Sequence, residues 1–267
     1  MTKNEENLRF SFGANWKHYL STVTEQEVAV ARESLINLLG EEDRFNQASF
    51  IDIGCGSGLF SYCAHQLGCR EIVSIDLDPE SVSATRRLAV AWCGSVPEHW
   101  SISEADILDT EKLKPYRGRF DIVYAWGSLH HTGAMYQALS NALSLGTDQC
   151  MAVIAIYART KTSSVWYHIK RMYNSVPSFL KPVIALPYTM IWGLGRLLKG
   201  RHPWKRKRGM NIWHDTLDWF GGFPYEFAGP DEIVSFVEKH GFSIKKMNIT
   251  TRNGCIEYVL TRTQDGA

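Results

Sequence analysis

The sequence has almost no net charge and no paired cysteine motif, and these absences exclude several classes of protein. Its 29 lysines and arginines against 28 acids give a net charge of +1, so no chain-wide positive field would attract nucleic acid. The six cysteines lack the paired spacing of a metal site, so we expect reduced core residues and no metal. Residues 1–6 are polar and hold no apolar signal region, which favours a cytoplasmic location.

A glycine-rich turn follows an apolar run at 50–53 and lacks one glycine of the dinucleotide-binding pattern. The turn reads Asp52-Ile53-Gly54-Cys55-Gly56-Ser57-Gly58. Glycine lets the backbone pass close to a ligand, because no Cβ blocks the approach. A dinucleotide-binding turn would carry its third glycine at position 59, where this chain has Leu59. The spacing therefore indicates a nucleotide-type cofactor while disfavouring a nicotinamide dinucleotide.

The turn resembles the first motif of the class I S-adenosylmethionine-dependent methyltransferases. Further motifs of that family follow in order as far as residue 131. They are Asp76 after the apolar run 72–75, Ala105-Asp106-Ile107, the apolar run 120–126, and Leu129-His130-His131. The segments 10–16 and 208–226 look like parts of the broad bacterial small-molecule group, the ubiquinone-biosynthesis-like enzymes and their relatives.

The resemblance implies S-adenosylmethionine as cofactor and S-adenosylhomocysteine as product. Asp52 would lie beside a cationic group of the ligand, Asp76 would accept both ribose hydroxyls, and Asp106 would accept from the adenine amino group. Ile107 would cover the adenine ring. The full set of expected cofactor-binding residues is Asp52, Gly54, Cys55, Gly56, Gly58, Asp76, Leu77, Asp106, Ile107 and Trp126.

Alternating apolar runs and helical patterns between 50 and 157 predict an α/β fold, a Rossmann-like doubly wound sheet. The resemblance implies seven strands, closed by an antiparallel hairpin at 243–250 and 255–262. We divide the chain into an N-terminal helical entrance segment, a cofactor-binding core, an insertion or substrate lid, and a C-terminal helix with hairpin. Their ranges are 1–45, 46–157, 158–228 and 229–267.

The helical and aromatic insertion after the fifth strand contains an apolar stretch at 179–198 and a basic run at 199–208. Two prolines, two glycines and two cations argue against a membrane-spanning helix in the apolar stretch. Three interpretations remain: a lid folded on the core, a peripheral contact of 179–208 with the inner membrane, and contact with RNA phosphates. The aromatic insertion is also a possible dimer interface, so the oligomeric state stays open.

Methyl transfer from a sulfonium is an in-line displacement that needs a base when the acceptor is a hydroxyl. His131 is the first candidate base, since it follows the fourth predicted strand, and His130 is its neighbour. His214, oriented by Asp215 or Asp218, is the second candidate. These aromatic-flanked polar residues would form either an acceptor pocket or a buried turn.

Two motifs that are missing from the sequence limit the class of methyl acceptor. Amino-directed nucleic-acid methyltransferases carry Asn/Asp-Pro-Pro-aromatic after the fourth strand, and this chain reads Ala125-Trp126-Gly127-Ser128 there, without a Pro-Cys nucleophile. We therefore predict methyl transfer to oxygen, nitrogen or sulfur of a small-molecule acceptor, hydrophobic or lipid-like. The alternatives are an RNA methyltransferase and an adaptor protein that docks on membrane or RNA.

Overall fold

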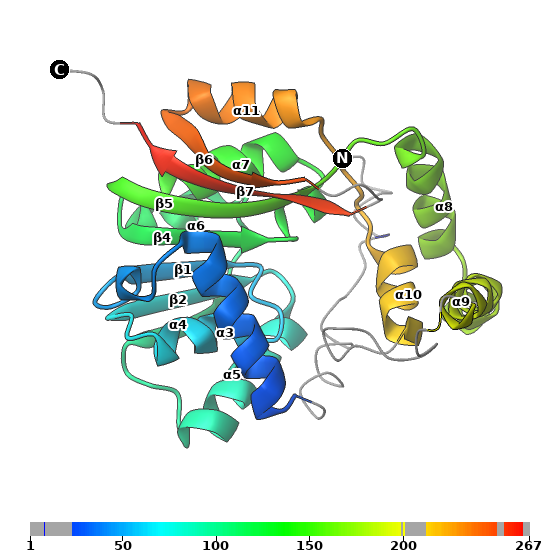
Figure 1. Cartoon of the computed structure of the whole chain (residues 1–267), viewed down its shortest axis with the longest axis horizontal. Helices are drawn as coiled ribbons and strands as arrows, with labels where there is room; N and C mark the ends of the chain where they lie inside the picture. The colour runs from blue at the N-terminus through cyan, green and yellow to red at the C-terminus, as the bar shows by residue number, and fades with distance from the viewer. Residues whose placement is uncertain (1–7, 9–22, 199, 201–211, 250–253, 264–267) are drawn as a thin grey trace.

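The computed structural model describes residues 8, 23–198, 200, 212–249 and 254–263 (Figure 1). Within them, seven strands form one sheet in the order β3-β2-β1-β4-β5-β7-β6. The strands are β1 (Ser49–Ile53), β2 (Glu71–Asp76), β3 (Trp100–Glu104), β4 (Phe120–Trp126), β5 (Gly146–Tyr157), β6 (Phe242–Asn248) and β7 (Cys255–Arg262). β1 to β5 are parallel, and β7 runs antiparallel to both β5 and β6. The predicted Rossmann-like sheet with its closing hairpin is confirmed.

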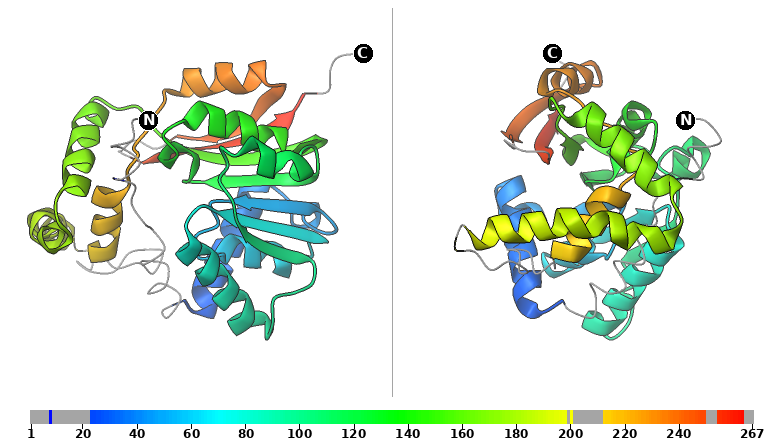
Figure 2. Two further views of the ribbon diagram at one scale, coloured as in Figure 1. Left: turned by 180° about the vertical axis from the view of Figure 1, so that it is seen from behind. Right: turned by 90° about the vertical axis from the view of Figure 1, so that its right-hand side faces the viewer.

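The central strands are apolar on both faces because helices cover both faces. Phe50 of β1 packs toward α3 (Glu25–Leu39), α4 (Leu59–Gln66) and α5 (Pro79–Cys93). Its neighbour Ile51 packs toward α6 (Thr110–Leu113), α7 (Met135–Ser144) and α11 (Pro230–Lys239). Figures 1 and 2 show these two layers of helices with the sheet between them.

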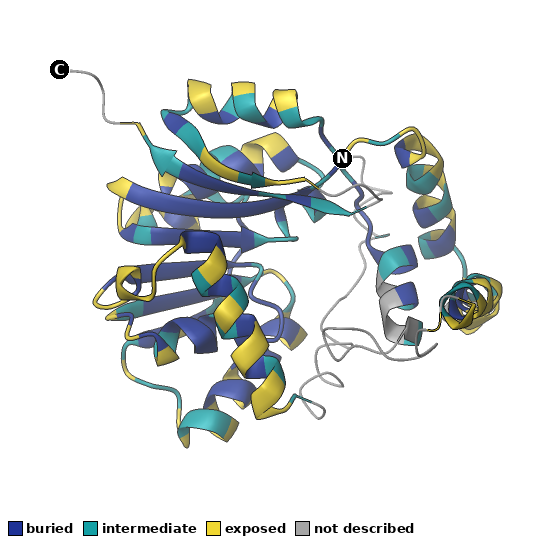
Figure 3. Cartoon of the chain, viewed as in Figure 1, coloured by how far each residue is buried: buried dark blue, intermediate teal, exposed yellow. Residues whose placement is uncertain are grey.

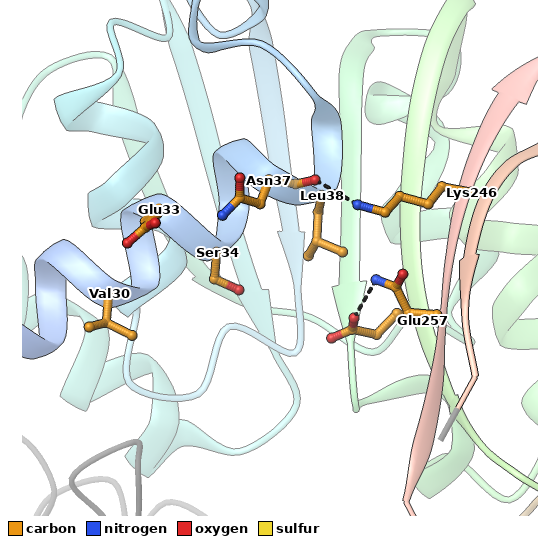
Figure 4. Close-up of a pocket in the computed structure, with 8 residues that line it drawn as sticks. Val30, Glu33, Ser34, Asn37, Leu38, Lys246 and Glu257 are labelled. Carbon is orange, nitrogen blue, oxygen red and sulfur yellow. Dashed lines mark hydrogen bonds between the residues drawn. The ribbon is translucent and has the colours of Figure 1, made fainter. Parts of the chain in front are cut away.

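The helix α3 begins with a capping contact from the residue before it. The backbone N–H of Thr24 donates to Glu27 Oε2 at 2.7 Å, which is half of a capping box. At its other end the helix contacts the hairpin, where Lys246 Nζ of β6 donates to the carbonyl of Asn37 at 2.9 Å. A groove of about 330 Å³ lies between α3 and the hairpin, away from the glycine turn (Figure 4).

The insertion forms three helices, α8 (Ser163–Ser175), α9 (Lys181–Leu197) and α10 (Ile212–Gly221), beside the carboxyl ends of the strands (Figure 1). They enclose a small apolar cluster of their own, in which Tyr173, Ala185 and Phe220 are buried. The chain returns to the core through residues 223–228, the return segment, and Ala228 forms a parallel bridge with Ala158. The insertion thus leaves and rejoins the core at one place.

No helix in the part of the chain that the structure describes is both long and apolar enough to cross a membrane. α9 has 17 residues and contains Pro187.

Candidate active site

The glycine turn after β1 is held against the end of β2. The backbone N–H groups of Gly54 and Cys55 both donate to the carbonyl of Ile75, at 2.8 and 3.1 Å. Gly54 has a φ of 75° and Gly58 a φ of 78°, in the left-handed region that favours glycine. Packing also requires glycine at Gly54, since a Cβ there would lie 2.3 Å from Ser128 Cβ. The turn therefore presents bare backbone to the space above the strand ends.

Asp76 ends β2 directly beside this turn. Its Oδ2 accepts from the Gly56 N–H at 3.0 Å, and its Oδ1 accepts from the Asp78 N–H at 2.9 Å. Burial raises the Asp76 pKa to about 6 despite these two donors. Each carboxylate oxygen can accept a second hydrogen bond, which fits the predicted contact with two ribose hydroxyls. Leu77, the next residue, is 38% exposed at the same edge.

Asp52 lies under the turn and is only 3% exposed. Ser61 Oγ donates to Asp52 Oδ2 at 2.6 Å, and Ser74 Oγ donates to Ser61 Oγ at 2.7 Å. Trp100 Nε1 donates to Ser74 Oγ at 2.8 Å, so the chain of hydrogen bonds runs from β3 to β1. Burial is the main cause that raises the Asp52 pKa to about 7. A buried carboxyl with one hydroxyl donor is suited to a cationic ligand, whose charge would favour the ionised form.

The remaining cofactor candidates lie at the ends of β3 and β4. Asp106 Oδ1 accepts from the Leu108 N–H at 2.9 Å, which closes a tight turn after β3. The Ile107 side chain is packed into the core, 7% exposed, so its predicted cover of the adenine ring stays a prediction. Trp126 Nε1 donates to Glu257 Oε1 of β7 at 2.9 Å, and its predicted contact with the cofactor also stays a prediction.

Cys55 is a buried spacer in the turn, as its size indicates. Its thiol lies 3.3 Å from Thr85 Oγ1, and burial raises its pKa well above the ordinary value. Asp121, at the far end of β4, accepts from both the N–H and the hydroxyl of Ser49 at 2.9 and 2.8 Å. Asp121 is therefore a structural residue that joins β1 to β4.

His131 ends a short 3-10 helix, η3 (Leu129–His131), directly after β4. Its Nδ1 lies 2.6 Å from the carbonyl oxygen of Pro224 in the return segment. A carbonyl only accepts hydrogen bonds, so Nδ1 carries the proton and Nε2 is the basic nitrogen of the neutral ring. The structure thus gives His131 the tautomer that a general base requires.

His130, the neighbouring candidate, is fully buried. Its ring lies between those of His131 and Tyr157, with centroid distances of 4.5 and 4.0 Å. Among the residues that the structure describes, neither of its ring nitrogens has a hydrogen-bond partner. Burial, with His131 and Lys170 nearby, lowers its pKa well below the ordinary value. A ring enclosed in this way packs against its aromatic neighbours, and its catalytic role stays a prediction.

The second candidate base lies in α10. The backbone of His214 and Asp215 belongs to this helix, while their side chains and that of Asp218 lie outside the described residues. Their catalytic role stays a prediction.

The return segment contributes contacts that the sequence did not predict. The Glu226 N–H donates to the carbonyl of His130 at 3.0 Å, and the Glu226 carboxylate accepts from the Met135 N–H at the start of α7 at 3.1 Å. The Ala228 N–H donates to the carbonyl of Tyr157 at 3.0 Å. The return segment therefore joins η3, α7 and the end of β5.

Lys170 of α8 is another residue that sequence reasoning missed. It is fully buried and donates to the carbonyl of Trp219. Its Nζ lies 4.2 Å from the ring centroid of Trp219, 4.8 Å from that of Tyr225 and 5.8 Å from that of Tyr157. In the sequence it belongs to a basic aromatic helix without any signal of burial. Because it lies between α8, α10 and β5, it links the insertion to the core.

The strand order, the bare glycine turn and the two strand-end acids define a class I methyltransferase core. Residues 51–152 match the family described as a methyltransferase domain, and this range contains the glycine turn, Asp76 and Asp106. The residues fit S-adenosylmethionine, because the buried Asp52 favours a cationic group and the Asp76 carboxylate can accept further hydrogen bonds from hydroxyl groups.

Two curated relatives match part of the chain. The ribosomal protein L11 methyltransferase of Polynucleobacter necessarius subsp. necessarius (strain STIR1) is 29% identical over 147 residues, which make up 48% of this chain and 40% of that protein. The rRNA N(6)-adenosine-methyltransferase metl-5 of Caenorhabditis elegans is 34% identical over 101 residues, 37% of this chain and 44% of that protein. The matches thus span less than half the length of either relative.

A solved structure shares the fold over almost the whole chain. The magnesium protoporphyrin IX methyltransferase of Synechocystis PCC 6803, solved with bound S-adenosylhomocysteine, superposes with a TM-score of 0.58 at 15% identity. The alignment covers 97% of this chain and 98% of that one.

Proposed function

We propose that this protein is an enzyme that transfers a methyl group from S-adenosylmethionine to an oxygen, nitrogen or sulfur atom of a small, partly apolar molecule. The observation that carries the proposal is the pairing of His131 with Pro224, which places a basic imidazole nitrogen after β4. An adaptor protein that only kept the fold would have no use for a base of fixed tautomer. A cytoplasmic location is part of the same proposal.

Three groups of this chain would hold the cofactor. The turn from Gly54 to Gly58 offers backbone, Asp76 offers carboxylate oxygens to the ribose, and Asp52 offers a buried negative charge. When bound, S-adenosylmethionine supplies a methyl group that is electrophilic because of its sulfonium.

His131 Nε2 would take the proton from an acceptor hydroxyl as that oxygen becomes nucleophilic. The Pro224 carbonyl holds the Nδ1 proton and so stabilises the imidazolium that forms. An acceptor that is already nucleophilic, such as a free amine or thiolate, would use His131 for orientation alone.

The surroundings of His131 support an acceptor with aromatic or apolar parts. The ring of Tyr157 meets that of His131 edge to face at a centroid distance of 5.5 Å. Tyr157 also contacts Tyr225 and Trp219, with centroids at 5.1 and 5.7 Å. The Synechocystis neighbour, which aligns over 97% of this chain, is named for a small-molecule acceptor, whereas the two curated relatives are named for ribosomal ones and match less than half of this chain.

The test is a methyl-transfer screen with labelled S-adenosylmethionine and an extract of the source cells. The extract is separated into small-molecule, lipid, RNA and protein fractions, and the purified protein is added to each. We expect label in the small-molecule or lipid fraction, and none with Asp76→Ala. If the label is found in RNA or protein alone, the proposal of a small-molecule acceptor is overturned. If calorimetry finds no binding of S-adenosylhomocysteine, the proposal that this protein is a methyltransferase is overturned.

A further inference from the structure

The outer face of α9 is an exposed apolar surface. It consists of Val183, Leu186, Met190, Ile191, Leu194 and Leu197, which are between 49% and 72% exposed. In Figure 1 this helix is the part of the insertion farthest from the sheet, and Figure 3 shows its exposed residues on the side that faces solvent. Exposed apolar residues are normal when scattered singly, while a contiguous group of this kind marks an interaction site.

The spacing of these residues makes the surface continuous. At 3.6 residues per turn the six side chains fall within an arc of about 140°. Pro187 is the one further residue of the helix within that arc, so the arc holds no charged side chain. The opposite face is already occupied, since Ala185, Thr189 and Gly193 are buried and α9 packs on α10. Of the two faces of α9, one therefore stabilises the insertion and the other is left for a partner.

The charge of the insertion identifies the kind of partner. No aspartate or glutamate occurs between residues 149 and 214, while twelve lysines and arginines do. The rest of the chain has 17 cations against 28 acids, so the positive charge is concentrated in the region that carries α9. Among the described cations, Lys161 and Arg171 are exposed on the α8 side. The run 199–208, which follows α9 directly in the sequence, adds six more.

We propose that the outer face of α9 docks on an anionic lipid bilayer, with its apolar side chains entering the boundary between headgroups and acyl chains. A helix that presents an apolar arc and belongs to a segment with twelve cations and no acid has the composition of an interfacial membrane contact. A second copy of this chain fits the surface less well, because two positively charged insertions would face each other. RNA also fits the surface less well, because the arc has no charged or polar side chain that could bind its phosphates.

The experiment is flotation of the full chain with vesicles of phosphatidylcholine containing phosphatidylglycerol, compared with phosphatidylcholine alone. We expect the wild-type chain to float with the anionic vesicles, less with neutral ones, and less at high salt. The double variant Met190→Asp, Ile191→Asp should bind at least about tenfold more weakly, because two buried apolar contacts are replaced by charges that anionic lipid repels. Val90→Asp, on α5, changes a valine that is 50% exposed and should float like wild type.

Three results would overturn the proposal. The first is that the wild-type chain does not float when anionic vesicles are present. The second is that the double variant floats as well as the wild type. The third is a wild-type dimer in light scattering that the double variant converts to a monomer, which would assign the outer face to a second copy. Circular dichroism of both variants checks that they fold.

Discussion

His131 and Pro224 are 93 residues apart in the sequence, yet the Nδ1 of the first lies 2.6 Å from the carbonyl oxygen of the second. One residue belongs to the core and the other to the return segment of the insertion. The same segment contacts His130, Tyr157 and the start of α7 through its own backbone and Glu226. The protonation pattern of the proposed base is therefore set by the part of the chain that also borders the acceptor.

Replacing His131 by asparagine separates the hydrogen bond to Pro224 from the basicity of the ring. The asparagine amide can still donate to the Pro224 carbonyl, while the basic Nε2 is lost. For a hydroxyl acceptor we expect kcat to fall by about 10²- to 10⁴-fold, with unchanged affinity for S-adenosylhomocysteine. Rates are measured with the acceptor fraction from the screen, and His168→Asn, at an exposed position of α8, serves as the control. A wild-type rate in His131→Asn would show that the acceptor needs no base.

The affinity for the cofactor should decrease as the pH falls from 8 to 5. Burial raises the pKa of Asp76 to about 6 and that of Asp52 to about 7, and the bound ligand favours the ionised form of both. At pH 5 about one Asp76 carboxyl in ten is ionised, so this residue alone weakens binding about tenfold. Calorimetry at several pH values measures the effect. Asp76→Asn should bind weakly with a smaller pH dependence, and an affinity that is constant with pH in the wild type would contradict the role of both acids.

The ligand-free protein should show the opposite trend in stability. The folded-state pKa of Asp52 lies above the ordinary value of 3.8, so the folded state binds the proton more tightly and stability decreases as the pH rises from about 4 to about 7. The loss is at most ~4 kcal/mol, because each pKa unit corresponds to ~1.4 kcal/mol. Asp52→Asn should therefore raise Tm more at pH 8 than at pH 5, and should weaken cofactor binding. An equal change in Tm at both pH values would show that Asp52 is not the titrating group.

Gly54→Ala should destabilise the protein much more than Gly94→Ala. Both glycines have positive φ, 75° and 80°, but a Cβ at Gly94 meets nothing within 4 Å, whereas one at Gly54 meets Ser128. We expect about 1–2 kcal/mol for Gly94→Ala from the backbone alone, and about 2–5 kcal/mol for Gly54→Ala because the clash adds to it. Urea denaturation measures both.

The clash can be tested by adding Ser128→Gly to Gly54→Ala. Removing the Ser128 Cβ should restore part of the stability, although the hydrogen bond from Ser128 Oγ to the Ile53 carbonyl, 2.6 Å long, is lost. Additive effects of the two substitutions would contradict the steric explanation.

Local patterns in the sequence predict most of the core. The strand at 120–126 and the helix that begins at Pro79 are found where the apolar periodicity places them. One difference is β5: its apolar run begins at Cys150, yet the strand starts at Gly146, and the preceding Thr147 and Asp148 are polar and resemble a turn. The pairing of β4 with β5 is irregular at this point, between Phe120 and Ile122.

The sequence does not predict contacts between distant segments. The hydrogen bonds that link Trp100, Ser74, Ser61 and Asp52 join four elements, and no local pattern marks the serines. The exposed face of α9 is hidden for a different reason, because that helix is apolar on both sides and its periodicity does not reveal which side is covered. His130 and His131 are adjacent in the sequence, and only tertiary packing shows that one is enclosed.

The bridge between Ala158 and Ala228 fixes the two ends of the insertion side by side. A loop whose ends meet in this way can change in length and sequence without moving the strands to which it is attached. The helical part of the insertion, ahead of the return segment, can therefore vary in length and sequence while the glycine turn and Asp76 keep their places.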